Sequence, residues 1–466
     1  MSTVTKASAG SAEVPGTFDG LGINEKFLGM LSRAGYTVPT PIQEQSIPVS
    51  LRGEDVLGIA QTGTGKTLAF GVPMIQRLVV EKGIGLVVLP TRELAVQVES
   101  SLHRIGKELG IRTALLIGGE PIVKQFRVLK MRPHIIIVTP GRLIDHLEQK
   151  SVDLSAVKVL VLDEADRMLD MGFAPQLKRI LQEVPATRQT MLFSATMPDA
   201  IVKIASGYMK LPVRVEVARA GTAAKNVTQE VLFVHKADKL AALKQVISEE
   251  AGNILVFSRT KFGAKKIAGN VRDWGFSSTE LHSNRSLNQR LSSLQGFKTG
   301  KYKVLVATDI AARGIDVTGI ALVVNFDLPM QAEDYVHRIG RTGRAGLSGR
   351  AISFAAPEQR RDVRDIERLI GQMLPVKQIG KLERLAPSPR AREEVQATPR
   401  LYSPRTARPA NPFTPSRPPL GATRSHSGRS SAGRSRGNSR PGYGRPPAPR
   451  ALPSGSRRAG SSLSHR

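Results

Sequence analysis

Two short segments of the chain carry residue types suited to the chemistry of a nucleoside triphosphate. Residues 60–67, Ala-Gln-Thr-Gly-Thr-Gly-Lys-Thr, form a glycine-rich segment that ends in lysine and threonine. The backbone N–H groups of such a loop can surround phosphates. Residues 163–166, Asp-Glu-Ala-Asp, follow the apolar run 157–162. This order predicts carboxylates at the end of a buried strand, where Asp163 can hold a magnesium ion.

Each of these segments also has an ordinary structural interpretation. A glycine-rich turn can precede a helix and bind nothing, and Ala60 stands where the strict pattern has glycine. Acidic residues are common at helix N-termini because they interact favourably with the helix dipole. The order and spacing of the two segments together favour the nucleotide-binding interpretation of both.

The overall charge indicates a polyanionic partner. The 466 residues include 68 Lys and Arg against 39 Asp and Glu, a formal net charge of +29. Nucleic acid fits this charge better than a membrane does, because no basic amphipathic helix stands out. A generic basic surface is the alternative. The absence of cysteine excludes disulfides, thiolate metal sites and cysteine nucleophiles.

The distribution of apolar residues predicts a cytoplasmic protein that makes no contact with a membrane. Residues 1–16 are small and polar, without the apolar core of a signal peptide. No later apolar run approaches the length needed to span a bilayer.

Apolar runs that alternate with helical segments predict two α/β domains in tandem. The expected strands are buried on both faces, which is typical of parallel, doubly wound sheets. They lie at residues 85–89, 134–139, 157–162 and 190–193, and then at 253–257, 302–307, 320–325 and 351–354. Helices are expected at 23–34 and 68–80. We assign residues 17–217 to the first domain, 218–227 to a linker and 228–385 to the second domain, which has no Gly-Lys-Thr loop of its own.

A segment near the start of the first domain has features of an adenine-binding site. Pro39 and Pro41 predict a rigid, extended turn that fixes the directions of Tyr36 and Gln43. An aromatic ring can stack on a base, and a carboxamide can pair with the N6 donor and N7 acceptor of adenine. Taken alone, the segment could equally be a linker.

The composition changes at about residue 386. Residues 386–466 contain sixteen arginines, no lysine and two acids among many Pro, Ser and Gly. So few apolar residues cannot offset the entropy of ordering, so we expect a disordered tail, as we do for residues 1–16. Arginine-rich segments of this kind suit contact with nucleic acid without sequence readout. The alternative is a solubilising tail with no specific partner.

Taken together, the ordered motifs resemble those of DEAD-box RNA helicases, from Phe18 to about residue 370. The resemblance rests on Phe18, 35–43, 60–67, 90–95, 118–119, 139–142, 163–166, 194–196, 256–257, 308–316 and 337–344. Within the family, the arginine-rich tail and short core look most like the bacterial RhlE-type branch. The resemblance implies two RecA-like domains that close around ATP, with a Q motif at 16–44.

The resemblance also implies which residues hold ATP. The implied nucleotide-binding residues are Phe18, Tyr36, Gln43, Ala60, Gln61, Thr62, Gly63, Thr64, Gly65, Lys66, Thr67, Gly314 and Asp316, with Arg313 serving the closed site. Lys66 would bind the β- and γ-phosphates, and Thr67 and Asp163 would hold Mg²⁺. Glu164 would position or deprotonate the attacking water.

Hydrolysis in this family also depends on the second domain. Arg341 and Arg344 match the arginine fingers that stabilise charge on the γ-phosphate oxygens. A solvated basic turn is the alternative for both. Asp166, Ser194, Thr196 and His337 resemble the set that couples the domains and would form hydrogen bonds only when the domains meet. Helix capping is the alternative for these short polar side chains.

The residues implied in RNA contact suit phosphates rather than base edges, so binding is expected to be independent of sequence. They are Pro90, Thr91, Arg92, Gly118, Gly119, Thr139, Gly141, Arg142, Arg290, Thr308 and Asp309. One position departs from the family pattern, because Leu287 stands where glutamine usually precedes the arginine that matches Arg290. Gln289 and Arg285 are both candidates for the missing support.

The resulting hypothesis is an ATP-dependent RNA helicase, a monomer that unwinds short duplexes locally and remodels RNA–protein assemblies. Ribosomal precursors or the RNA-decay machinery are candidate partners. Two other classes use overlapping residues: an ATP-gated RNA clamp with little unwinding, and a processive DNA translocase. Strand displacement separates the helicase from the clamp, and stimulation by RNA but not DNA argues against the translocase.

Overall fold

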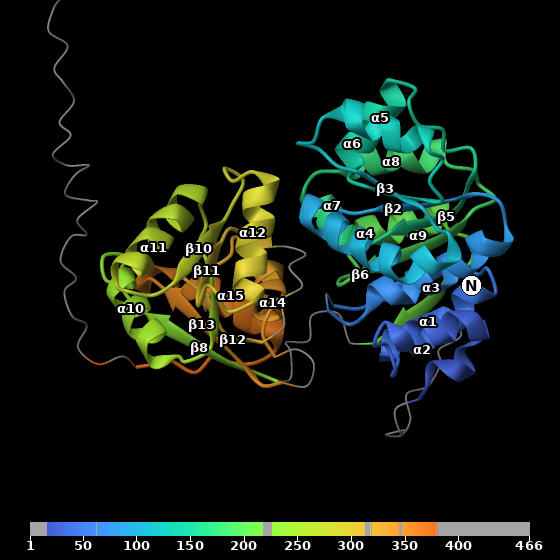
Figure 1. The fold of residues 1–466 in the computed structure, drawn as a ribbon. Coiled ribbons are helices and arrows are strands. Elements are labelled where there is room, and N and C mark those ends of the chain that lie inside the picture. Colours follow the sequence, from blue (N-terminus) through green and yellow to red (C-terminus); the bar gives the residue numbers. More distant parts are fainter. Residues whose placement is uncertain are drawn as a thin grey trace, which may run out of the picture. The chain divides into compact units, whose positions relative to one another are not determined.

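In the computed structural model, residues 16–61, 63–217, 226–312, 317, 319–343, 347–378 and 380 are described. The predictions for residues 1–15, for most of the linker and for the tail at 386–466 lie outside these ranges. The described residues form two parallel sheets with helices on their faces (Figure 1). Each domain is considered by itself below.

The first domain is built on a seven-stranded parallel sheet. Its strand order is β3-β4-β2-β5-β6-β1-β7. The strands are β1 Val56–Ile59, β2 Ile84–Val88, β3 Thr113–Leu116, β4 Ile135–Val138, β5 Val157–Leu162, β6 Gln189–Ser194 and β7 Val213–Glu216. The helices are η1 Phe18–Leu21, α1 Glu25–Arg33, α2 Pro41–Leu51, α3 Lys66–Val80, α4 Arg92–Gly106, η2 Lys107–Leu109, α5 Ile122–Lys130, α6 Pro140–Glu148, α7 Ala165–Asp170, α8 Ala174–Glu183 and α9 Asp199–Tyr208.

The second domain is built on a six-stranded parallel sheet with the order β10-β11-β9-β12-β13-β8. Its strands are β8 Val227–Phe233, β9 Asn253–Phe257, β10 Ser278–Leu281, β11 Val304–Ala307, β12 Ile320–Asn325 and β13 Gly349–Ala355. Its helices are α10 Lys239–Glu249, α11 Lys261–Asp273, α12 Leu287–Lys298, α13 Asp309–Ala312, α14 Ala332–Ile339, η3 Pro357–Gln359 and α15 Arg360–Ile370. Beyond α15 the chain returns to the sheet edge, where Val376 pairs with Val231 of β8.

The core of each domain lies on both faces of its sheet. Along β2, Val87 packs in the cluster on one face, whereas Leu86 and Val88 pack in the cluster on the other. In β9, Leu255 and Val256 divide between the two faces of the second sheet in the same way. This alternation follows from the period of two in a strand. It explains why these strands are apolar throughout.

All eight predicted strands are confirmed, and so are the helices expected at 23–34 and 68–80, within two residues at most ends. Five strands were not predicted: β1, β3, β7, β8 and β10. Four of these have only four residues, and β10 reads Ser-Thr-Glu-Leu although every one of its residues is buried. Such segments carry too little apolar periodicity to identify a strand.

The prediction of an extended turn around Pro39 and Pro41 was wrong from Pro41 onward, because a helix begins there. Pro41 is the first residue of α2, and Thr40 is its N-cap. Proline is favoured at this position because its φ already suits a helix and its missing N–H needs no partner there. Gln43 therefore lies in the first turn of a helix, where its side chain completes a capping box with Thr40.

Asp55 joins three strands at the start of β1. Its Oδ1 accepts a hydrogen bond from Thr190 N at the start of β6, and its Oδ2 accepts one from Lys210 N ahead of β7, both at 2.7 Å. The side chain is buried. A carboxylate in this position fixes β1 between its two neighbours and so sets where the loop after β1 begins.

We expect Asp55→Ala to lower the free energy of unfolding by about 2–4 kcal/mol, because the buried N–H of Thr190 and the partly buried N–H of Lys210 both lose their acceptor. Asp153→Ala provides a control. Asp153 accepts one local bond from Ser155 N on the surface, so its loss should cost under about 1 kcal/mol. Denaturant unfolding of both variants measures the difference. Equal effects would mean that Asp55 does not hold the strands together.

Candidate nucleotide and RNA site

The strand order of the first sheet sorts the candidate residues into two groups along one edge. The strands run parallel, so the loops that follow them all emerge at the carboxyl edge. The expected nucleotide residues in these loops follow β1 and β5, and the expected coupling residues Ser194 and Thr196 lie at the end of β6, which is between them in the order β5-β6-β1. The expected RNA residues follow β2, β3 and β4, which are neighbours in the order β3-β4-β2. The two groups meet where β2 pairs with β5.

A hydrogen bond marks this meeting point. The backbone N of Asp163, after β5, donates to the carbonyl of Val88 at the end of β2, at 3.2 Å. The segment Pro90–Arg92 follows Val88 within two residues. The starts of the two loops are therefore joined by a backbone hydrogen bond.

The glycine-rich loop after β1 has the backbone that a phosphate-binding loop needs. Gly63 and Gly65 have φ values of +89° and +91°, a region that favours glycine. A Cβ at Gly65 would collide with the side chain of Gln43. The loop leads into α3, whose first residue is Lys66, so the N-terminal N–H groups of the helix face the loop.

A cavity of about 320 Å³ adjoins this loop. Several expected nucleotide-binding residues line it, together with four from α4 that were not predicted to do so, Leu94, Gln97, Val98 and Ser101. The predicted residues that line it are Tyr36, Gln43, Gly63, Gly65, Lys66, Thr67, Asp163 and Glu164. One cavity therefore brings together residues from the Q-motif region, the loop and the end of β5.

The expected adenine-binding residues differ in their surroundings. Gln43 Nε2 donates to the carbonyl of Gly65 at 2.9 Å, and its Oε1 accepts from Thr40 N at 2.9 Å. This links α2 directly to the phosphate-binding loop. Tyr36 is half-buried, with the guanidinium of Arg104 5.2 Å from its ring centroid. Phe18 is buried in the core of the domain.

Lys66 and Asp163 form a buried pair at the bottom of the cavity. Lys66 Nζ lies 3.2 Å from Asp163 Oδ1, and both side chains are buried. Burial raises the pKa of the Asp163 carboxyl, and the neighbouring ammonium opposes that rise. Among the residues that the structure describes, none forms a hydrogen bond of good geometry with Lys66 Nζ. A buried ammonium without hydrogen bonds is suited to phosphate oxygens.

The same residues fit a magnesium ion bound with phosphates. Mg²⁺ is held in nucleotide sites by one or two protein oxygens, with phosphates and waters completing its shell. The Thr67 hydroxyl and the Asp163 carboxylate both line the cavity and can supply those oxygens. Among the described residues, no group of three or more His, Asp or Glu could hold a metal by itself.

Glu164 has a strained backbone and a fixed carboxylate. Its φ is +54° and its ψ is +48°, a left-handed conformation that costs a non-glycine residue free energy. Arg167 Nη1 donates to Glu164 Oε2 at 2.9 Å, and both side chains are almost fully buried. Asp163 Oδ1 accepts from Glu164 N at 2.9 Å. Local contacts on both sides therefore hold this turn in its strained form.

Asp166 bridges β6 and α7 inside the first domain. Its Oδ2 accepts from Ala195 N, Thr196 N and the Thr196 hydroxyl at 2.9–3.1 Å. The expectation that these polar groups form hydrogen bonds only when the domains meet is therefore wrong for Asp166 and Thr196. Ser194 is fully buried and its hydroxyl has no partner among the described residues.

The first-domain RNA residues lie on three adjacent loops. Thr91 caps α4 by accepting from Leu94 N at 3.3 Å, and Arg92 follows it. Gly119 has a φ of +81°, and a Cβ there would collide with the guanidinium of Arg92. Arg142, near the start of α6, donates to the carbonyl of Glu120 at 3.0 Å. Contacts between the loops thus hold the three segments together.

A buried polar network behind these loops was not predicted. His146 of α6 places Nε2 3.1 Å from Gln125 Oε1 and Nδ1 2.8 Å from the Ser151 hydroxyl. Gln125 Nε2 donates to the carbonyl of Ile117, just before the Gly118–Gly119 pair, at 2.9 Å. A neutral ring with its proton on Nε2 satisfies both of its contacts. Burial, with the nearby charge of Arg142, lowers the pKa of His146.

In the second domain, the expected RNA residue Asp309 is bound by an arginine. Arg338 donates from Nε and Nη2 to the two carboxylate oxygens of Asp309 at 2.5 and 2.7 Å. Its Nη1 donates to the carbonyl of Asp327 at 2.6 Å. Arg338 is buried. This role of Arg338 was not predicted, because the resemblance to the family assigns roles only to its neighbours His337 and Arg341.

The second domain contains three further candidates: Thr308 next to Asp309, His337 on α14, and Arg341 just after α14. His337 is half-buried on α14, and Arg341, just after it, is buried and donates to the carbonyl of His337 at 3.2 Å. Thr308 begins the turn that follows β11. The predictions for Thr62, Arg313, Gly314, Asp316 and Arg344 lie outside the described residues.

Both candidates for the missing glutamine have partners around the start of α12. Gln289 forms a capping box with Ser286, the residue before α12. Arg285 Nη2 donates to the buried carboxylate of Glu280 at 2.8 Å. The two residues support different parts of the segment that leads to Arg290, so both remain candidates for the support that glutamine gives in the family pattern.

These features together define a class. Two α/β domains with parallel sheets, the first with a phosphate-binding loop beside a buried Lys–Asp pair, describe a tandem RecA-like nucleotide-binding protein. Solved structures agree. The chain resembles Mss116p bound to ssRNA and AMP-PNP, with a TM-score of 0.73 and 29% identity over 80% of this chain and 81% of that one. It also resembles S. cerevisiae Dbp5 bound to RNA and ADP BeF3, with a TM-score of 0.70, 29% identity and coverage of 78% and 95%.

Sequence comparison gives the family. Residues 40–204 match the DEAD/DEAH box helicase model, and residues 238–346 match the helicase conserved C-terminal domain. A DEAD-box ATP-dependent RNA helicase CshA of Geobacillus kaustophilus is 43% identical over 374 residues, 80% of this chain and 78% of that protein. The ATP-dependent RNA helicase CshA of Listeria monocytogenes is 42% identical over 353 residues, 75% and 68% of the two chains.

The chain therefore belongs to the DEAD-box family of ATP-dependent RNA helicases, enzymes that hydrolyse ATP. Both relatives bear the name CshA, so the resemblance to the RhlE-type branch is not confirmed. Within the described ranges, no helix is both long and apolar enough to cross a membrane.

The lowered pKa of His146 makes a prediction about stability and pH. A histidine whose pKa is lower in the folded state contributes stability above its unfolded pKa of about 6.5, and that contribution is lost as the pH falls toward the folded value. We expect His146→Gln to lower the thermal midpoint at about pH 7.5 but to lose less stability than the unmodified protein between about pH 7.5 and pH 5. His235→Gln, at an exposed position, controls for the loss of a histidine. Parallel pH curves for the unmodified protein and His146→Gln would contradict the prediction.

Proposed function

We propose that this chain hydrolyses ATP in response to RNA and uses closure of its two domains to separate short RNA duplexes locally, without processive movement. It would also remodel RNA–protein assemblies. The observation that best supports this is the shared edge of the first sheet, where the loop after β5 is bonded to the end of β2. A nucleotide bound at one group of loops and RNA bound at the other would then stabilise one common arrangement.

In this proposal the buried pair serves the phosphates. Lys66 binds the β- and γ-phosphates, which take the place of Asp163 as the partner of its ammonium. Asp163 is then free to hold Mg²⁺ with Thr67. Bound Mg²⁺ neutralises phosphate charge during transfer. The carboxylate and ammonium already lie 3.2 Å apart, so little rearrangement is needed.

Glu164 orients the attacking water. A general base must lie within hydrogen-bond reach of the proton that it accepts. The strained turn and the ion pair with Arg167 fix the direction of this carboxylate at the cavity. Arg341 and Arg344 would supply positive charge from the second domain, which makes hydrolysis conditional on closure.

Adenine recognition falls to the Q-motif residues. Both polar groups of the Gln43 carboxamide are bonded, to Thr40 and Gly65. We infer that adenine replaces the bond to Gly65, so the loop senses the base. Tyr36 would stack on adenine on the side away from Arg104. Phe18 would act from the core, by supporting this region. The proposed set is completed by Ala60, Gln61, Thr62, Gly63, Thr64, Gly65, Gly314 and Asp316.

RNA binding is proposed to use backbone contacts on both domains. In the first domain, Arg92 and Arg142 are anchored by neighbouring loops, which suits phosphates held at fixed spacing. In the second, Asp309 would act mainly by holding Arg338, with Thr308 and Arg290 contacting the strand. His337, Ser194, Thr196 and Asp166 would connect the domains on closure.

Several finer assignments belong to the same proposal. We place the domains at 17–217 and 228–385, joined by 218–227. We keep the RhlE-type branch as an interpretation of the tail, although the relatives are named CshA. Ribosomal precursors or the RNA-decay machinery are the proposed settings, and the monomer is the proposed state.

The first test is steady-state ATP hydrolysis with no nucleic acid, with single-stranded RNA and with DNA of the same sequence. We expect stimulation by RNA only. Glu164→Gln should reduce RNA-stimulated turnover by about 10²-fold or more, because the water loses its base. Thermal unfolding of the variant controls for folding. Equal turnover under all three conditions would contradict RNA-gated closure.

Strand displacement then tests local unwinding. Without processive stepping, the yield of displaced strand should fall steeply as the duplex is lengthened. A yield that does not depend on duplex length would favour a translocase, and RNA-stimulated hydrolysis without displacement would favour a clamp.

A further prediction concerns the arginine-rich tail. Deleting residues 386–466 should weaken RNA affinity and flatten its salt dependence, because each lost phosphate contact removes about 0.7 from the log–log slope on single strands. Turnover at saturating RNA should change little. A deletion variant whose slope equals that of the full chain would contradict a role for the tail in RNA binding.

A further inference from the structure

One basic surface of the first domain is not used by any of these assignments. Between residues 121 and 144 the chain contains five Lys or Arg and no Asp or Glu. One of the five is Arg142, which is already assigned to RNA contact. The other four, Lys124, Arg127, Lys130 and Arg132, lie on α5 and the turn after it, and all four are exposed. We call these four residues the α5 basic surface.

The α5 basic surface carries uncompensated charge. None of its four cations forms an ion pair with a residue in the described part of the chain, whereas nearby carboxylates have other partners. Asp145 lies 3.2 Å from Arg142, and Glu148 lies 2.8 Å from Arg179. Most exposed cations of a folded domain can be explained as a solvated face, but adjacent carboxylates usually accompany them. No carboxylate lies on α5 or on the turn after it, and Glu120, just before the helix, forms no ion pair with these four cations, which favours an anionic ligand.

The geometry of α5 aligns the charges. Lys124, Arg127 and Lys130 are spaced three residues apart, so they form a row that spans about 9 Å along the helix. The opposite face of α5 carries Gln125, which is buried against the chain before Gly118. The row therefore projects away from the domain.

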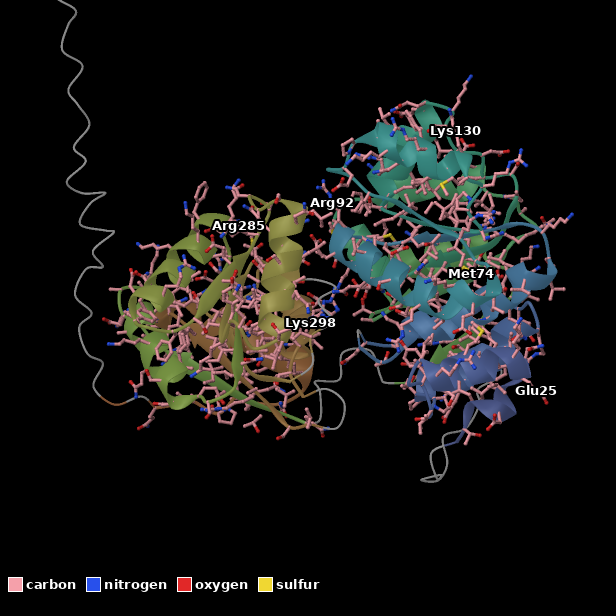
Figure 2. All side chains as sticks on the ribbon, in the orientation of Figure 1. Glu25, Met74, Arg92, Lys130, Arg285 and Lys298 are labelled. Atoms are coloured by element: carbon pink, nitrogen blue, oxygen red, sulfur yellow. The ribbon has the colours of Figure 1, made fainter. Side chains whose placement is uncertain are left out.

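The α5 basic surface is attached to the RNA-binding loops. The helix begins three residues after Gly119. It is held against α6 by the Gln125–His146 contact and by the ring of Phe126, which meets the His146 ring edge-on at a centroid distance of 5.5 Å. α5 and α6 lie together at one end of the first domain (Figure 1), and Lys130 is labelled at that end in Figure 2.

We propose that the α5 basic surface binds the phosphate backbone of RNA that extends beyond the segment held by Gly118, Gly119 and Arg142. The inference rests on the proposed RNA binding of the first domain and adds a second contact region to it. α5 is the crossover from β3 to β4, so it runs from the carboxyl edge of the sheet toward the opposite edge. Lys124 lies nearest the RNA loops along the chain, and Lys130 lies two helical turns further on.

RNA fits this surface better than an acidic protein does. The row is continuous along the chain with the loops that bind phosphate, and lysine and arginine side chains contact phosphates without a fixed geometry. Such contacts release counterions, so they have a signature in the salt dependence of binding. A merely structural role for these exposed side chains would leave that signature unchanged.

The test replaces three cations in the full chain. The variant Lys124→Gln/Arg127→Gln/Lys130→Gln is compared with the unmodified protein by titration with a single-stranded RNA long enough to extend past the core site, at several salt concentrations. We expect weaker binding at low salt and a log–log slope shallower by up to about 2, from about 0.7 for each contact. Thermal unfolding verifies that the variant is folded.

Two further variants make the outcome specific. The variant Lys82→Gln/Lys107→Gln/Lys158→Gln removes the same number of positive charges at exposed positions. Lys82 precedes β2, Lys107 precedes β3 and Lys158 lies at the start of β5, so all three lysines lie at the amino edge of the sheet. It should keep the slope of the unmodified protein. Lys124→Arg/Lys130→Arg retains the charge and should keep the slope as well.

The outcomes separate this inference from the proposed function. If the unmodified chain binds RNA and the α5 variant has the same slope and affinity as the amino-edge variant, the α5 basic surface is a solvated face or binds another class of partner, and the inference is overturned. If the unmodified chain neither binds RNA nor hydrolyses ATP in response to it, the proposed function fails as well.

Discussion

The parallel register of the first sheet is the constraint on which the site depends. All loops that follow its strands emerge at one edge, and the strand order decides which loops are neighbours. The order places the candidate nucleotide and coupling loops beside one another and the candidate RNA loops beside one another, with β2 and β5 at the boundary. In the proposed function, coupling between two ligands needs no long pathway, because one backbone hydrogen bond from Asp163 to Val88 crosses the boundary.

The nucleotide site combines buried charge with backbone strain, and both are costly unless neighbouring groups compensate. Lys66 and Asp163 compensate each other, as do Glu164 and Arg167. Removing one member of such a pair leaves an uncompensated buried charge, which is strongly destabilising. The left-handed backbone at Glu164 persists because bonds on both sides hold it. The left-handed backbone at Glu164 therefore carries a cost in local stability, which these bonds offset.

The loops proposed to bind RNA depend on supporting contacts as well as on the side chains proposed to touch the ligand. Arg92 packs over Gly118 and Gly119, and His146 with Gln125 fixes the two helices that follow those loops. In the second domain, Arg338 holds Asp309 in the same supporting way. Such groups position phosphate contacts at fixed spacing, and this suits recognition of a backbone rather than of bases.

The sequence by itself determined the features that depend on local chemistry: the glycine-rich loop, the buried strands, the carboxylates after β5 and the order of the family motifs. Short or polar strands such as β10 could not be predicted from the sequence, and neither could the position of Gln43 in a helix. Only the tertiary structure decided the pairing of Asp166 with Thr196 and of His146 with Gln125. These partners are about twenty to thirty residues apart, and which polar groups meet across such separations depends on strand order and helix packing, which local patterns do not specify.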